Sequence, residues 1–171
     1  MIYFIRKESN RKELNKMKFW GRVKEQNKLQ KMLSKKQQQL ALVYGRRRVG
    51  KSELIKQCLR DSSLKSIYYE CKQTTEMNNV ESLAELLAEA FNFPPLAFKN
   101  IEEVLNFFFK QAQHMPLILV LDEYPYLREA VKGMDSILQG LVDKYQESSQ
   151  LKLIICGSYV DIMKSLLLVQ N

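Results

Sequence analysis

Four short apolar runs constrain the fold of this 171-residue chain more than any other feature. They are separated by longer amphipathic stretches and span 39–44 (QLALVY), 66–70 (SIYYE), 116–123 (PLILVLDE) and 151–158 (LKLIICGS). Runs with little polar alternation are typical of strands that are buried on both faces, as in a parallel sheet covered by helices. Strands that alternate with helices favour right-handed crossovers, so the sequence predicts an α/β sandwich.

Helical spacing of apolar residues between these runs predicts the intervening helices, at 23–36, 50–60, 79–91, 100–113 and 134–147. In the first helix, Leu29, Met32 and Leu33 recur among lysines and glutamines, which predicts an apolar inner face and a basic outer face. Residues 1–18 show no clear period and form a basic N-terminal arm in this interpretation. The remainder, 19–171, is interpreted as one core domain.

The segment 45–52 lies between the first predicted strand and a predicted helix. It fits the pattern G-x-x-x-x-G-K-[ST], and its residues are Gly45, Arg46, Arg47, Arg48, Val49, Gly50, Lys51 and Ser52. The glycines permit a bend that points successive backbone N–H groups at phosphate oxygens, with the positive helix end behind them. We expect Lys51 to reach the β- and γ-phosphates of a nucleotide and Ser52 to bind Mg²⁺.

Polar residues at the ends of two later runs supply the other candidates for this site. Asp122 follows an apolar strand and is the expected second Mg²⁺ ligand, while Glu123 beside it is the candidate general base for an attacking water. Ser158 ends the last run and is expected to contact the γ-phosphate or that water. Carboxyl ends of parallel strands gather ligands at one edge of such sheets, so these residues should meet.

Charge is distributed unevenly along the chain. The net charge is +8, and residues 1–60 carry 18 Lys and Arg against 4 Asp and Glu. This asymmetry indicates either a polyanionic partner, such as a nucleotide, a nucleic acid or an anionic membrane surface, or simply a solvated basic helix.

Cysteines and the N-terminus bear on the cellular compartment. Cys58, Cys71 and Cys156 are odd in number and widely spaced, which is typical of reduced core thiols in a cytoplasmic protein. The apolar opening MIYFI is too short for a signal sequence or a membrane span. We therefore expect a soluble cytoplasmic protein with no membrane partner.

Four segments occur in the order typical of a known family. They are Phe19-Trp20-Gly21-Arg22 with Glu25 and Leu29, then GRRRVGKS (45–52), LVLDEYPYL (119–127) and LKLIICGSYVDIM (151–163). Over residues 19–168 the chain resembles the AAA+ ATPases of the archaeal type, which are P-loop proteins related to the STAND and origin-recognition ATPases.

This resemblance implies a P-loop NTPase fold, a three-layer sandwich whose parallel sheet has the strand order 5-1-4-3-2. The strand before Ser158 would then lie between the phosphate-loop strand and the strand before Asp122. The resemblance also implies that ATP and Mg²⁺ are the cofactors and that the adenine pocket is lined by Phe19, Trp20, Gly21 and Arg22. Members of the family commonly continue into a winged-helix module.

The chain departs from the family pattern at Gln26 and Tyr159, and it stops at Asn171, before the family's fifth strand, lid and arginine elements. An arginine contributes about 10³ to 10⁵ to the rate of phosphoryl transfer. A water-activating carboxylate contributes about 10² to 10⁴. We therefore expect ATP binding with slow Mg²⁺-dependent hydrolysis. Without a fifth strand, the phosphate-loop strand 39–44 should also be an unprotected sheet edge.

The favoured function is an ATPase that acts as a nucleotide-driven switch coupled to DNA or to an acidic protein partner. A P-loop small-molecule kinase is one alternative, although Lys164 is the only basic residue after Ser158, so no arginine-bearing lid is visible. A DNA-binding module with a vestigial nucleotide site is the other. The basic N-terminal third supports it through phosphate contacts, whereas the intact Lys51, Ser52, Asp122 and Glu123 argue against it. No Asn-Lys-x-Asp segment occurs, which disfavours a GTPase.

The three consecutive arginines of the loop have no required role in holding phosphate. Arg48 stands where many loops of the family carry a further glycine, so we expect it to brace the loop. Arg46 and Arg47 are expected to face outward, toward DNA, an acidic partner or a neighbouring subunit. The alternative is that they pair with nearby carboxylates or are solvated.

Overall fold

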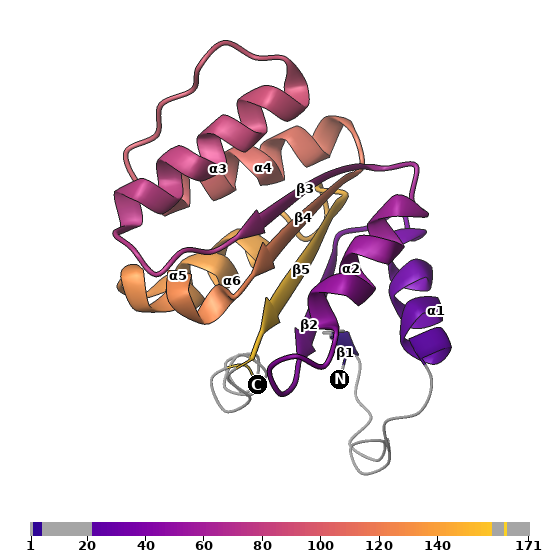
Figure 1. Cartoon of the computed structure of the whole chain (residues 1–171). Coiled ribbons are helices and arrows are strands. Elements are labelled where there is room, and N and C mark those ends of the chain that lie inside the picture. The colour runs from indigo at the N-terminus through magenta and orange to yellow at the C-terminus, as the bar shows by residue number, and fades with distance from the viewer. Residues whose placement is uncertain (1, 5–21, 159–162, 164–171) are drawn as a thin grey trace.

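A computed structural model describes residues 2–4, 22–158 and 163 of the chain (Figure 1). The strands are β1 (Ile2–Phe4), β2 (Gln39–Tyr44), β3 (Lys65–Glu70), β4 (Leu117–Asp122) and β5 (Leu151–Gly157). The helices are α1 (Arg22–Leu33), α2 (Lys51–Arg60), α3 (Glu76–Phe91), α4 (Ile101–His114), α5 (Tyr124–Ala130) and α6 (Met134–Lys144).

The strands form one sheet with the order β1-β2-β5-β4-β3, in which β2, β5, β4 and β3 run parallel. Helices α1 and α2 cover one face of the sheet, and α3, α4, α5 and α6 cover the other (Figure 1). Strand β5 lies between β2 and β4, as the resemblance implied. The predicted three-layer α/β sandwich with the parallel P-loop order is confirmed.

Alternate residues of each central strand pack into two separate cores. In β2, Val43 packs with α1 and α2, whereas its neighbour Leu42 packs with the helices on the other face. Ile154 and Leu153 divide in the same way in β5. Both faces of these strands are therefore apolar, which explains why the strands appear in the sequence as continuous apolar runs.

The prediction of an unprotected edge at β2 is wrong. Strand β1 pairs antiparallel with β2 along that edge, with Ile2 opposite Val43 and Phe4 opposite Ala41. The N-terminal segment thus supplies the hydrogen-bonding partner at this edge of β2. A strand of three residues is too short to show a period in the sequence, so the arm 1–18 was predicted without it. The rest of that arm lies outside the described residues.

The described helices follow the predicted pattern, with one helix added. Helix α1 buries the predicted apolar residues, and its exposed lysines are Lys24, Lys28 and Lys31, which confirms the basic outer face. Helix α3 begins earlier than predicted because the Thr75 side chain caps it by accepting from the N–H of Asn78. Helix α5, directly after the Asp122-Glu123 pair, was not predicted. None of the described helices combines the length and apolar character needed to cross a membrane.

Candidate functional site

The phosphate loop joins β2 to the N-terminus of α2. Gly50 is the N-cap of α2 and adopts a left-handed conformation with φ 79° and ψ 26°, which favours glycine. Because this cap has no side chain, it forms no side-chain hydrogen bond with the first N–H groups of α2. The first backbone hydrogen bond of the helix runs from the N–H of Leu54 to the carbonyl of Gly50, at 3.0 Å. Among the described residues, the N–H groups of Lys51, Ser52 and Glu53 before it have no hydrogen-bond acceptor, which suits an anion.

The Lys51 ammonium turns back over the loop. Its Nζ donates to the carbonyls of Gly45 at 3.1 Å and Arg46 at 3.0 Å, and to the Ser158 hydroxyl at 3.1 Å. All three acceptors are uncharged, and Lys51 has no carboxylate ion pair among the described residues. The positive charge is therefore available for an anionic group.

Ser52 and Asp122 are 70 residues apart in the sequence and meet in the fold. The Ser52 hydroxyl donates to Oδ2 of Asp122 at 2.7 Å. Asp122 ends β4 on the face that α2 covers, and only 3% of its surface is exposed. The structure therefore brings together the two residues expected to bind Mg²⁺, and their role as cation ligands stays a prediction.

The Asp122 carboxylate accepts hydrogen bonds from several donors, of which Ser52 is one. Burial alone would raise the pKa of Asp122, but the hydrogen bonds outweigh burial and hold this pKa below its ordinary value. The donors are the side chains of Cys156, Tyr68 and Ser52 and the N–H of Glu123, the last at 2.9 Å from Oδ1. The carboxylate is thus kept ionised, as a cation ligand must be.

Glu123 is held in an unusual backbone conformation at the start of α5. Its φ of 49° and ψ of 40° lie in the left-handed region, which costs a non-glycine residue about 1 kcal/mol or more. Its Oε1 accepts from the Ser158 hydroxyl at 3.3 Å, so the chain of contacts runs from Lys51 through Ser158 to Glu123. Its Oε2 is buried without a hydrogen-bond partner among the described residues. An unpartnered carboxylate oxygen here could accept a proton from a bound water.

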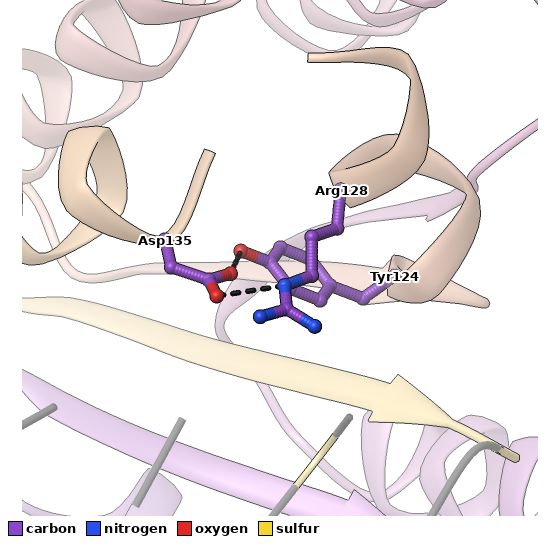
Figure 2. Close-up of polar contacts among 3 residues, drawn as sticks. All are labelled: Tyr124, Arg128 and Asp135. Carbon is purple, nitrogen blue, oxygen red and sulfur yellow. Dashed lines mark hydrogen bonds and ion pairs between the residues drawn. The ribbon is translucent and has the colours of Figure 1, made fainter. Parts of the chain in front are cut away.

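A partly buried cluster of polar contacts anchors α5, and therefore the position of Glu123. Figure 2 shows Tyr124 and Arg128 of α5 converging on Asp135 of α6. The Tyr124 hydroxyl donates to Oδ1 of Asp135 at 2.8 Å, and Nε of Arg128 donates to Oδ2 at 2.7 Å. Burial, and secondarily the Asp135 charge, raises the pKa of Tyr124, so this hydroxyl stays protonated. The residue directly after Glu123 is thus tied to a second helix.

The end of β5 touches the same helix. A Cβ on Gly157 would lie 2.8 Å from Cδ of Pro125 and 2.9 Å from Sδ of Met163. Only glycine fits this approach, which sets Ser158 beside the start of α5.

All three loop arginines are exposed, and none forms an ion pair among the described residues. Arg47 donates from Nη2 to the hydroxyl of Tyr126 at 2.9 Å. Arg48 has a positive φ of 61°, a backbone conformation that favours glycine. Lys51, rather than Arg48, makes the described hydrogen bonds that hold the loop carbonyls.

The expected adenine-binding segment falls mostly outside the described residues. Phe19, Trp20 and Gly21 are not described, and Arg22 is described only as the first residue of α1. Their role in binding the base stays a prediction.

The described residues contain no group of three or more His, Cys, Asp or Glu side chains that could hold a metal alone. Mg²⁺ in nucleotide sites is bound by one or two protein groups together with phosphate oxygens and water. The pair of Ser52 and ionised Asp122, next to the free N–H groups of α2 and the uncompensated Lys51, fits such a cation together with a polyphosphate.

The sheet order and the loop between β2 and α2 define the class of this protein, which is an α/β domain with the P-loop NTPase fold. The family described as "ATPase domain predominantly from Archaea" matches residues 19–169, and the chain belongs to this family.

The chain is similar to longer proteins from archaea. The uncharacterized protein MJECL04 of Methanocaldococcus jannaschii is 26% identical over 145 residues, which cover 85% of this chain and 30% of that protein. The Walker-type ATPase PABY2304 of Pyrococcus abyssi matches with a TM-score of 0.62 and 24% identity, covering 88% of this chain and 48% of that one. The Aeropyrum pernix ORC1 protein, solved in complex with DNA, matches with a TM-score of 0.57 and 20% identity, over 84% and 40%. The chain thus spans less than half the length of each, and at these identities the structural likeness shows the fold alone.

Proposed function

We propose that this domain binds ATP with Mg²⁺, hydrolyses it slowly, and acts as a nucleotide-driven switch coupled to DNA or to an acidic partner. The observation that carries the proposal is the 2.7 Å hydrogen bond between Ser52 and Asp122 beside the uncompensated Lys51. It brings a hydroxyl, an ionised carboxylate and an ammonium to the N-terminus of one helix. Membership of an ATPase family supports the nucleotide-binding part of the proposal.

Each group has a distinct role in this proposal. The N–H groups at the start of α2 and the ammonium of Lys51 bind the phosphates. Ser52 and Asp122 would hold Mg²⁺, which when bound neutralises charge that develops on the phosphate oxygens. Ser158 orients Glu123, whose unpartnered Oε2 takes a proton from the attacking water as oxygen bonds to the γ-phosphorus and the bond to ADP breaks.

We infer slow hydrolysis from the side chains that contact Glu123 and Ser158. Among the described residues, no hydrogen bond or ion pair joins an arginine to Glu123 or Ser158. An arginine at the transferred phosphate contributes about 10³ to 10⁵ to the rate. We propose that such a group comes from a partner or from another part of a longer protein.

Replacing Lys51 with Ala should weaken ATP binding by about 10- to 100-fold, because a charge-assisted contact to phosphate is lost. Titration calorimetry with ATP and MgCl₂ measures this directly. Lys110→Ala is the matched control, since Lys110 is an exposed lysine on α4, on the other face of the sheet. Equal affinity of wild type and K51A would contradict a phosphate-binding loop.

The part of the proposal that concerns DNA or an acidic partner rests on the exposed basic residues of the phosphate loop, α1 and α2. The loop exposes Arg46, Arg47 and Arg48. Helices α1 and α2 lie together on one face of the sheet (Figure 1). They expose further basic residues, which are Lys24, Lys28, Lys31, Lys56 and Arg60, the last paired with Glu53. Exposed cations of this density favour a polyanion through counterion release. A structural neighbour was solved with DNA, which makes duplex DNA the first partner to test.

The double variant Arg46→Ala with Arg47→Ala should weaken DNA binding several-fold and flatten its salt dependence by about two phosphate contacts. ATP affinity should stay within a few-fold of wild type. Fluorescence anisotropy on labelled duplex DNA over a salt series measures the slope.

Two variants separate the causes of that result. Lys110→Ala with Lys132→Ala removes two exposed charges elsewhere and should leave the slope unchanged. Tyr126→Phe removes the hydroxyl that Arg47 contacts but keeps the charge, so DNA binding should be retained. A collapse of ATP affinity in the arginine variant would instead assign these residues to the phosphate site.

A further inference from the structure

Tyr68 is a site contact that neither the loop motif nor the strand-end motif contains. It lies in β3 on the face covered by α2, half-buried against the core formed by α1 and α2. Its hydroxyl donates to Oδ2 of Asp122. The ammonium of Lys56, one turn after Ser52 on α2, lies 5.0 Å from the centre of its ring. The ring is therefore held between α2 and the sheet, with its polar end at the Asp122 carboxylate.

Oδ2 of Asp122 receives two hydroxyl donors from different elements. Ser52 donates from the start of α2, and Tyr68 donates from β3. A bound cation would affect these two donors differently. The Ser52 oxygen would turn toward the cation, whereas Tyr68 belongs to a sheet strand and does not depend on the conformation of the loop.

We propose that Tyr68 is a positioning residue for Asp122, the carboxylate that would bind the cation. Its hydroxyl holds Asp122 in the orientation in which Ser52 shares the same oxygen, and so strengthens Mg²⁺ binding in the nucleotide complex. This inference rests on the proposed function, since the cation is the one that would accompany ATP. It adds a contact from β3 to a site otherwise built from the loop and from the ends of β4 and β5.

The neighbouring residue provides a matched control. Tyr69 lies in the same strand, points to the opposite core, and donates its hydroxyl to the Asn79 side chain. Tyr68→Phe and Tyr69→Phe therefore each remove one hydroxyl from β3 and one hydrogen bond to a side-chain oxygen. Only the first removes a donor from Asp122.

The experiment measures ATP affinity of the full chain by titration calorimetry at stepped Mg²⁺ concentrations, starting in EDTA. We expect Tyr68→Phe to raise the Mg²⁺ concentration that gives half of the affinity gain by about 10-fold, the size expected for one lost donor to a carboxylate. Affinity in EDTA should stay within about 2-fold, because the phosphate contacts are untouched. Tyr69→Phe should leave the Mg²⁺ midpoint at the wild-type value. Thermal unfolding of both variants separates a general loss of stability from the shift in the midpoint.

Each other outcome overturns the inference in an identifiable way. A Tyr68→Phe midpoint equal to wild type would show that the hydroxyl has no role in cation binding, while leaving the proposed function intact. A lower midpoint would show that Tyr68 competes with the cation. Equal shifts in the two variants would assign the effect to the stability of β3. Absence of ATP binding by the wild-type chain would overturn the proposed function and this inference with it.

Discussion

Replacing Glu123 with Gln should lower the rate of ATP hydrolysis by about 10² to 10⁴ while ATP affinity stays within a few-fold. The amide has the shape of the carboxylate, and its oxygen can still accept from the Ser158 hydroxyl. It lacks the basicity to take a proton from water. Because Asp122 and Ser52 keep their own hydrogen bond, the groups proposed to bind nucleotide and cation are unchanged. Single-turnover hydrolysis of radiolabelled ATP measures the rate.

Glu129→Gln is the matched control for that experiment, since Glu129 is an exposed glutamate of the same helix, α5. It should hydrolyse ATP at the wild-type rate. A rate of ATP hydrolysis by E123Q equal to that of wild type would exclude Glu123 as the general base. Transfer of the label to an added acceptor instead of water would favour the kinase alternative over the ATPase.

The parts of this site that were predicted from the sequence share one property, which is that short segments determine them. The bend of the loop needs Gly50 and the helix that follows it, and both lie within a few residues of Lys51 and Ser52. Asp122 and Ser158 were placed at strand ends because β4 and β5 are continuous apolar runs. Parallel strands then bring those ends to one edge, which is a general rule of the fold.

The parts that were missed depend on how distant segments pair. The proposed role of Tyr68 requires the register in which Glu70 lies opposite Asp122. Tyr68 is two residues before Glu70 and on the same face of β3, so in this register its hydroxyl reaches the Asp122 carboxylate. That register is set by two strands about 50 residues apart, and no local pattern encodes it. Strand β1 was missed because three residues show no period and the pairing with β2 is non-local.

Helix α5 was missed for a different reason. It has only seven residues, and Glu123 before it adopts a left-handed conformation that residue preferences do not predict for glutamate. Its position is fixed by the burial of Tyr124 and Leu127 in the core and by the contacts of Tyr124 and Arg128 with Asp135, which lies in the next helix. The strained backbone at Glu123 is thus offset by packing outside the motif, as is common where a side chain must be aimed at a site.

The stability of the fold should respond to pH through Lys152, a buried residue of β5 far along the strand from the site. None of its surface is exposed, and its Nζ donates to the carbonyls of Gln37 at 2.7 Å and Gln150 at 2.8 Å. Burial lowers the pKa of Lys152 from 10.5 to about 8. The folded protein therefore releases this proton at a lower pH than the unfolded chain does.

Between about pH 8 and pH 10.5 the unfolded state binds more protons at Lys152, so this residue's contribution to the free energy of unfolding rises with pH. Relative to Lys152→Met, which keeps an unbranched chain without the charge, wild type should gain about 3 kcal/mol across this window. Urea unfolding of both proteins at matched pH values measures the difference, in which tyrosine and cysteine titrations common to both cancel. Lys110→Met, an exposed control, should follow wild type at every pH. Parallel curves for wild type and K152M would mean that the ammonium is as well solvated by the two carbonyls as it is by water.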